Sequence, residues 1–178
     1  MKNVLKIIGV LVLAFFGYAA YMVLNPVSPK ETISYSSEIS ELEVVYSRPY
    51  KKDRLIFGFE EEGALVPFGK YWRTGANAAT KFKTSSDISF NGESLSAGEY
   101  ALFTFPYEDK WTVALSSESD VMFAVSQPDP KLDVVKTSVP VISLEKPVEQ
   151  FTIEFSKDSV SVNMRLMWDK VSISIPLE

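Results

Sequence analysis

The chain has 178 residues, and none of them is cysteine or histidine. Without cysteine there are no disulfide bonds, no thiolate nucleophile and no cysteine-ligated metal site. Without histidine the chain lacks the commonest general base and metal ligand, and it cannot form a Ser-His-Asp triad. Any catalysis would depend on carboxylate, lysine, tyrosine or serine side chains. The composition therefore predicts no cofactor and no metal, and it favours a non-catalytic protein.

Basic side chains are outnumbered by acidic ones. The chain carries 18 basic and 23 acidic residues, a net charge of −5. Two of the basic residues, Lys2 and Lys6, precede a hydrophobic run. The part of the chain beyond that run has 16 basic and all 23 acidic residues, which gives it a net charge of −7. Proteins that bind nucleic acid need a basic surface to neutralise phosphates, so we expect no nucleic-acid partner.

One long uncharged run extends from Ile7 to Leu24. As a helix, it would be about 27 Å long, close to the thickness of a bilayer's hydrocarbon core. Lys2 and Lys6 before it predict a cytoplasmic N-terminus by the positive-inside rule. We therefore expect residues 1–24 to form a single-pass anchor that contacts membrane lipid. Residues 25–178 would then lie in the extracytoplasmic, periplasmic space.

A cleaved signal peptide is the alternative interpretation of this run. Gly17 and Ala19 place small residues at the two positions that a signal peptidase reads. However, apolar residues continue through 21–24, beyond a cut after Ala19, which favours the anchor. Cleavage would leave a secreted domain, so both interpretations export the rest of the chain. A third interpretation, a buried helix of the globular domain, would not.

Residues 25–30 form a short polar linker with two prolines, and beyond it the apolar pattern repeats every two residues. Strict alternation is typical of antiparallel strands with one buried face. We expect turns at 91–92, 97–98, 156–159 and 169–170. We expect strands at 31–37, 41–48, 79–84, 87–90, 99–105, 110–116, 121–125, 133–138, 151–155, 160–168 and 171–175. The pattern predicts an all-β domain over residues 31–178, an antiparallel β-sandwich or barrel.

The last three of these strands predict the core most directly. Their alternation points one set of apolar side chains inward. That set is Phe151, Ile153, Phe155, Val160, Val162, Met164, Leu166, Val171 and Ile173.

Residues 49–78 break the alternation. The segment contains four glycines, two prolines and nine charged residues, and long irregular segments of compact domains are usually functional or mobile. Its run Glu60, Glu61 and Glu62 lacks the spacing of a cation cage, so a solvated loop is the better interpretation.

Several short motifs follow one another in an order typical of a bacterial family. They read YSRP at 46–49, RLIFG at 54–58, LVPFG at 65–69, WRTGAN at 72–77 and AGEYALF at 97–103. With the closing strands, the chain resembles the DUF2911 family over residues 31–177. The resemblance implies an exported, β-rich domain and no particular activity. Ala78 stands where the family usually has glutamate, and the segment after Trp111 is shorter than is usual there.

Arg48 and Arg73 are the first candidates for ligand binding. Each guanidinium offers a planar fork of donors that suits a carboxylate, a phosphate or a sugar. Thr74 and Asn77 belong to the turn after Arg73, and Trp72 offers an apolar wall. We expect Arg48, Arg73 and Asn77 to converge. In the alternative interpretation, both arginines bind loop carbonyls or nearby glutamates and hold the irregular segment in place.

Two classes of function remain open. The first is a binding or interaction module, with an anionic ligand, a sugar or a protein partner. The alternative is a carboxylate-dependent hydrolase that acts on an envelope component or a glycan. The hydrolase requires a carboxyl group with a strongly raised pKa beside Arg48 or Arg73, whereas the binding module does not.

Overall fold

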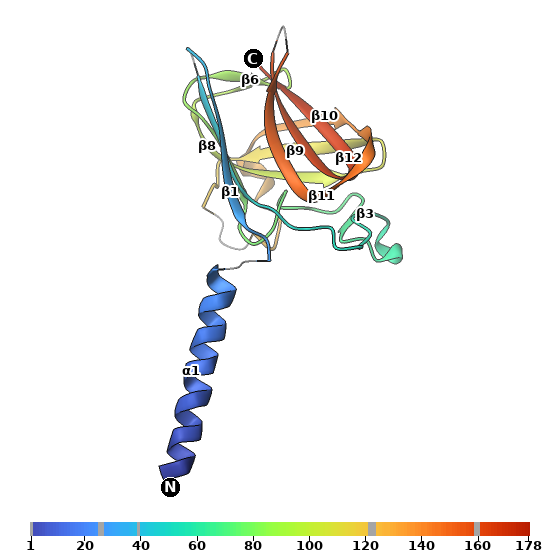
Figure 1. Cartoon of the computed structure of the whole chain (residues 1–178). Helices are drawn as coiled ribbons and strands as arrows, with labels where there is room; N and C mark the ends of the chain where they lie inside the picture. Colours follow the sequence, from blue (N-terminus) through green and yellow to red (C-terminus); the bar gives the residue numbers. More distant parts are fainter. Residues whose placement is uncertain (1, 25–26, 39, 121–123, 159–160) are drawn as a thin grey trace.

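The computed structural model describes residues 2–24, 27–38, 40–120, 124–158 and 161–178. It consists of one N-terminal helix, α1 (Lys2–Leu24), and a β domain (Figure 1). Two 3-10 helices, η1 (Glu60–Glu62) and η2 (Pro130–Leu132), lie in the connections. The strands are β1 (Lys30–Ser36), β2 (Glu41–Ser47), β3 (Phe57–Gly58), β4 (Val66–Pro67), β5 (Thr80–Thr84), β6 (Ile88–Phe90), β7 (Glu93–Leu95), β8 (Gly98–Pro106), β9 (Lys110–Ser116), β10 (Asp133–Pro140), β11 (Ile142–Lys157) and β12 (Val162–Leu177).

Two antiparallel sheets make up most of the domain. The six-stranded sheet has the order β1-β2-β5-β8-β9-β10, and the four-stranded sheet has the order β11-β12-β6-β7. The described strands do not close into a barrel, so the all-β antiparallel prediction is confirmed in its open, two-sheet form. A short parallel pair, β3 and β4, lies inside the irregular segment 49–78.

The core lies between the two sheets and is rich in aromatic rings. Strand β2 shows how the sequence builds it, because Leu42, Val44 and Tyr46 alternate with more exposed residues and are at most 4% exposed. The rings of Trp72 and Trp168 stack with their centroids 5.8 Å apart. Trp111 packs edge-on against Trp72 at 5.7 Å. The three tryptophans therefore form one cluster.

The inward-facing residues predicted for the closing strands are confirmed wherever the structure describes them. Those at most 2% exposed are Phe151, Ile153, Met164, Leu166 and Ile173. Those packed partly buried against the core are Phe155, Val162 and Val171. Val160 lies outside the described residues.

Three strand predictions need correction. Residues 124–125 of the strand expected at 121–125 are not in a strand, and residues 121–123 lie outside the described part of the chain. The strands expected at 160–168 and 171–175 are one strand, β12. Asp169 does not reverse the direction of the chain. Its positive φ of 52° coincides with an irregularity in the pairing with β11 at Val148, so the strand continues past it. Strands β3, β4, β7 and the first half of β11 were not predicted.

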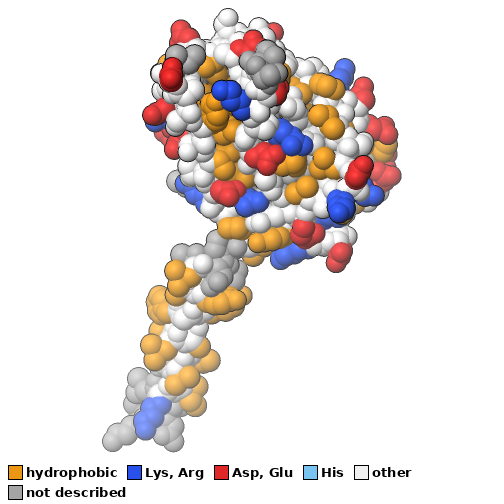
Figure 2. All heavy atoms as spheres, turned by 45° about the horizontal axis from the view of Figure 1, so that its top comes forward, with side chains coloured by type: hydrophobic (Ala, Val, Ile, Leu, Met, Phe, Trp, Pro, Cys, Tyr) orange, Lys and Arg blue, Asp and Glu red, His pale blue; other side chains and the backbone are white. Residues whose placement is uncertain are grey.

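Helix α1 projects away from the β domain in Figure 1. Its described apolar side chains are exposed. Ile7 near its start is 59% exposed, and Leu24 at its end is 78% exposed. Figure 2 shows these side chains along the helix and a mixture of acidic and basic side chains over the β domain. No helix among the described residues is both long enough and apolar enough to qualify as a membrane span. The membrane-spanning helix expected over residues 7–24 therefore stays a prediction.

The described strands and buried core of the β domain all lie within residues 28–178. All strands begin at or after Lys30. The buried core extends from Leu42 to Leu177, and the apolar residues that pack around it begin at Ile33. A domain of this size with its own core folds alone. We therefore expect residues 28–178 to fold without α1.

Candidate functional site

Arg48 lies at the end of β2, where its side chain bridges to two other strands. Its Nε donates to the carbonyl oxygen of Phe151 at 3.1 Å, and its Nη2 donates to Oγ1 of Thr152 at 2.8 Å. Its Nη1 donates to Oε1 of Glu31 at 3.2 Å. The Arg48 side chain is 23% exposed. Each guanidinium nitrogen therefore already has an acceptor in β1 or β11, an arrangement that matches the structural interpretation of Arg48.

Tyr46 extends this network into the core. Its hydroxyl donates to Oε2 of Glu31 at 2.6 Å and accepts a hydrogen bond from the backbone N–H of Ile153 at 2.9 Å. Burial, together with the hydrogen bond to Glu31, raises the pKa of the Tyr46 phenol well above its ordinary value. The hydroxyl thus remains a neutral donor, and it connects β1 and β2 to β11.

The turn after Arg73 packs closely against β2. An added Cβ at Gly75, whose φ is 153°, would lie 2.9 Å from the carbonyl oxygen of Ser47. Thr74 is fully buried with a φ of 54°, and its Oγ1 lies 3.1 Å from that of Thr104. The Trp72 indole N–H donates to the carbonyl oxygen of Gly75 at 3.0 Å. Trp72 and Thr74 therefore belong to the interior and not to an open wall.

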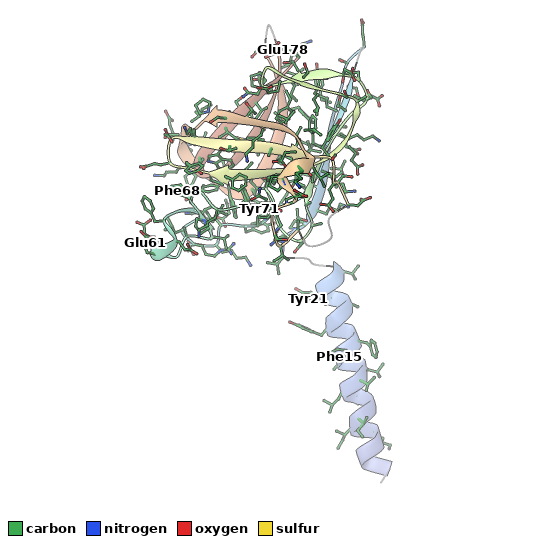
Figure 3. All side chains as sticks on the ribbon, turned by 180° about the vertical axis from the view of Figure 1, so that it is seen from behind. Phe15, Tyr21, Glu61, Phe68, Tyr71 and Glu178 are labelled. Carbon is green, nitrogen blue, oxygen red and sulfur yellow. The ribbon has the colours of Figure 1, made fainter. Side chains whose placement is uncertain are left out.

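The structure brings the predicted residues to one end of the domain, around the linker. Nη1 of Arg73 donates to the carbonyl oxygen of Asn77 at 2.9 Å. Nδ2 of Asn77 donates to the carbonyl oxygen of Ser28 at 3.5 Å, and the backbone N–H of Arg48 donates to that of Pro29 at 2.8 Å. This is the end from which α1 departs (Figures 1 and 3). The Arg48 backbone and the Asn77 side chain thus both contact the linker, and Arg73 contacts Asn77.

The acidic run also has structural roles. Oε2 of Glu62 accepts a hydrogen bond from the backbone N–H of Phe59 at 2.8 Å, which caps η1. Oε2 of Glu60 lies 2.9 Å from Nζ of Lys70 on the surface. In the part of the chain that the structure describes, no group of three or more acidic side chains is placed to hold a metal ion.

A pocket of about 720 Å³ opens at the other end of the domain, between the ends of the two sheets. Figure 3 places Glu178, one of its lining residues, at the end away from α1. Its apolar walls come from both sheets and are formed by Tyr35, Leu42, Ile88, Val162 and Leu177. Leu42 and Leu177 are each 4% exposed and also belong to the core. The pocket therefore reaches down to the hydrophobic interior.

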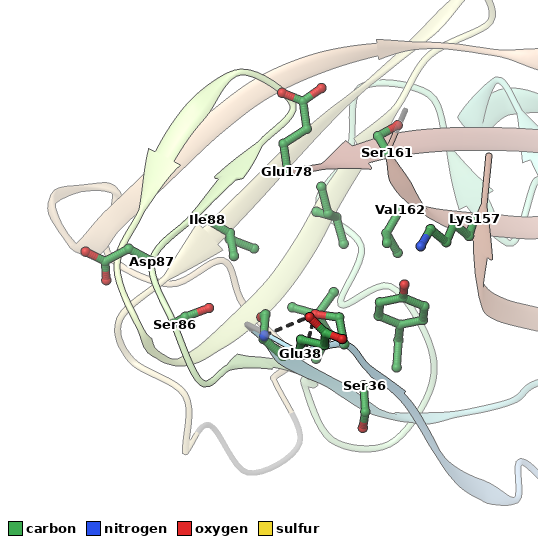
Figure 4. Close-up of a pocket in the computed structure, with 14 residues that line it drawn as sticks. Ser36, Glu38, Ser86, Asp87, Ile88, Lys157, Ser161, Val162 and Glu178 are labelled. Atoms are coloured by element: carbon green, nitrogen blue, oxygen red, sulfur yellow. Dashed lines mark hydrogen bonds between the residues drawn. The ribbon is translucent and has the colours of Figure 1, made fainter. Parts of the chain in front are cut away.

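Polar side chains form the rim of this pocket (Figure 4). Lys157 at the end of β11 directs its ammonium group over the opening. Asp87 and Glu178 direct their carboxylates away from it. Ser40 contributes a buried hydroxyl with no hydrogen-bond partner among the described residues. Five of the fourteen lining residues are apolar and nine are polar or charged. The pocket thus combines apolar walls with a largely polar rim.

No pattern in the sequence predicts this pocket. The lining residues come from four separated parts of the chain, 35–42, 86–88, 157–162 and 177–178. None of these parts contains a motif. The sequence contains one indirect indication of the pocket. Small polar residues gather near 36–40 and at 86, where strands end.

Carboxyl groups with a raised pKa would mark a catalytic acid. Burial raises the pKa of Asp133, at the start of β10. Three strands of the six-stranded sheet lie between β10 and β2, which carries the Arg48 end of the predicted site. Asp133 is also absent from the lining of the pocket. The condition set for a hydrolase beside Arg48 or Arg73 is therefore not met by this group.

Comparison with known proteins gives a family and no relative of known activity. No curated protein and no solved structure matches the chain. Residues 28–177 match the family described as "Protein of unknown function (DUF2911)". The match covers every strand of the β domain and excludes α1. The chain therefore belongs to the DUF2911 family.

Proposed function

We propose that the β domain is a binding module that takes a small ligand into the pocket between the sheet ends. The observation that carries this proposal is the pocket itself, which is about 720 Å³ in volume and has apolar walls from both sheets beneath a polar rim. Pockets of roughly 300–1,000 Å³ with an apolar interior and a few polar groups are typical of small-molecule sites. The pocket rim is open, so a ligand enters without movement of a sheet.

Binding without chemical transformation agrees with the side chains available. The chain has no histidine or cysteine to act as a base or nucleophile near neutral pH. The arginines first considered for binding donate to acceptors within the protein. They support the domain's linker end, whereas the pocket lies at the opposite end.

Filling the pocket tests this function. The Ser86 hydroxyl points into the pocket in Figure 4, and the Ser86 backbone makes the hydrogen bonds to Thr84. Ser86→Trp therefore blocks the pocket and leaves those bonds in place. Ser34→Trp is the matched control, because Ser34 is exposed on β1 and does not line the pocket.

The probe is anilinonaphthalene sulfonate, whose fluorescence rises in an apolar site, and the protein is residues 28–178. We expect saturable binding to the unsubstituted domain and to Ser34→Trp. We expect a loss of at least about tenfold in affinity for Ser86→Trp, with an unchanged melting temperature. Equal binding by all three proteins, or no saturable binding by any, would overturn the proposal.

We also propose that residues 7–24 deliver the domain to the extracytoplasmic side of a membrane. The exposed apolar side chains of α1 support this, since a long apolar surface is unfavourable in water. The intact mass of the protein purified from cells separates the two routes. A mass that includes residues 1–24, in the membrane fraction, indicates an anchor; a mass that begins after Ala19 indicates cleavage. The full mass in the cytosolic fraction would contradict both routes.

A further inference from the structure

We infer that the pocket selects an apolar molecule with an anionic head group, such as an aliphatic carboxylate, and that Lys157 pairs with the head. This inference rests on the proposed function of the pocket. It concerns the class of ligand. The apolar walls would contact the body of the ligand, and Lys157 on the rim would contact its head group.

The walls favour an apolar body of the ligand. Leu42, Val162 and Leu177 bring aliphatic side chains from β2 and β12, and Ile88 points into the pocket from β6 (Figure 4). The hydrophobic effect stabilises a ligand in proportion to the apolar area that it removes from water. A short aliphatic chain placed between these side chains would be covered by both sheets.

Lys157 supplies the charge that faces the pocket. It is the last residue of β11, and its ammonium group is directed over the opening in Figure 4. It forms no ion pair with any of the residues that the structure describes. An ammonium group in this position is available to a ligand, and it pairs with a carboxylate as it would with a protein side chain.

The acidic side chains of the rim differ from Lys157 in where their charged groups lie. The carboxylates of Asp87 and Glu178 point away from the opening in Figure 4. Oδ1 of Asp87 already accepts a hydrogen bond from the backbone N–H of Ala97 at 2.8 Å. Glu38, in the connection between β1 and β2, also lines the pocket. Its negative charge opposes an anionic ligand, so removing that charge should strengthen binding.

One serine hydroxyl is placed to donate to a bound molecule. The hydroxyl of Ser86 points toward the pocket in Figure 4. Hydroxyl groups donate to ligand oxygens, so Ser86 can bind a polar group of the ligand from the side of the pocket opposite Lys157.

Three matched probes test the choice of ligand with residues 28–178. Octanoate, octanol and octylammonium share one chain length and differ in head-group charge, and calorimetric titration gives a dissociation constant for each. We expect octanoate to bind about three- to fivefold more tightly than octanol, as an exposed ion pair allows, and octylammonium to bind most weakly. Added salt should reduce these differences.

Substitutions assign the difference to residues. Lys157→Met should bring octanoate to the affinity of octanol and leave octanol unchanged, whereas Glu38→Gln should strengthen octanoate binding. Lys146→Met is the matched control, because Lys146 is exposed on the same strand and does not line the pocket. Thermal melts check that each variant folds.

The outcomes separate the head-group assignment from the pocket proposal. If Ser86→Trp blocks all three probes but they bind with equal affinity, or octylammonium binds best, the anionic preference is overturned and the pocket stands. If none of the three binds and the fluorescent probe shows no saturable site, the pocket function itself fails.

Discussion

Tyr46 in β2 and Arg48, which directly follows β2, have side chains that reach the same carboxylate. Both donate to Glu31 in β1, and both also contact the backbone of β11, at Phe151 and Ile153. The set joins an edge strand of one sheet to an edge strand of the other. The stability that this set provides depends on several hydrogen bonds donated from one planar guanidinium group, which a single ammonium group cannot reproduce.

Arg48→Lys should therefore destabilise the domain even though the charge is kept. The loss of hydrogen bonds to Phe151 and Thr152, in a partly exposed place, should cost about 1–2 kcal/mol. For a domain of this size the melting temperature should fall by about 2–8 °C.

Arg73→Lys is the control for this substitution. Nη1 of Arg73 donates to the carbonyl oxygen of Asn77, four residues along the chain. Because this bond does not join the two sheets, losing it should lower the melting temperature less. The measurement is a thermal melt of residues 28–178 that is monitored by circular dichroism. A melting temperature unchanged by Arg48→Lys would remove the structural role of Arg48 and restore it as a candidate for ligand binding.

At the scale of elements, the turn after Trp72 is fixed against β2 by close backbone contact. Gly75 approaches the carbonyl oxygen of Ser47 so closely that a Cβ would overlap it. Thr74 and Asn77 both have a positive φ, at 54° and 64°. The turn is thus held in a backbone conformation that its neighbours impose, and it connects the linker end of the domain to the tryptophan cluster.

Gly75→Ala should cost about 1–3 kcal/mol, because the added methyl group meets backbone that cannot move aside. Gly63→Ala is the comparison. Gly63 also has a positive φ, 75°, but a Cβ there would meet no atom within 4 Å. Its cost should be confined to the left-handed conformation, about 1 kcal/mol. Urea denaturation of both variants measures the difference, and equal losses would show that the contact with Ser47 has no effect.

Elements differed in how far the sequence predicted them. Strands such as β2 and β12 bury one face, so their alternating side chains were visible in the sequence. The first half of β11 has little burial on either face, and β3 and β4 are two residues each, so neither left a pattern. The motifs around Arg48 and Arg73 were visible in the sequence. The pocket was not, because it depends on sheet pairing between distant segments, which local pattern does not contain.

At the scale of the whole molecule, the pocket and α1 lie at opposite ends of the β domain (Figures 1 and 3). If α1 holds the chain at a membrane, the pocket opens away from the lipid surface. In that case the domain would present the proposed ligand site to the surrounding solution. Arg48, the turn after Arg73 and the linker would form the end next to the helix.

Residues 28–178 should retain the full stability of the β domain when α1 is removed. The core and all strands lie within that range, and so do Ser28 and Pro29, whose carbonyl oxygens accept hydrogen bonds from Asn77 and Arg48. We expect a β-type circular dichroism spectrum and one cooperative transition. A mainly helical spectrum or a broad, non-cooperative melt would contradict the autonomous domain.

The packing of the three tryptophans also gives the domain an optical signature. Trp72, Trp111 and Trp168 are all the tryptophans of the chain, and the centroid separations of 5.7 and 5.8 Å allow their excited states to couple. Such coupling produces a circular dichroism signal of paired sign in the far ultraviolet, which vanishes when the rings separate. Because none of the three lines the pocket, this signal reports the integrity of the interior while ligands are titrated at the other end.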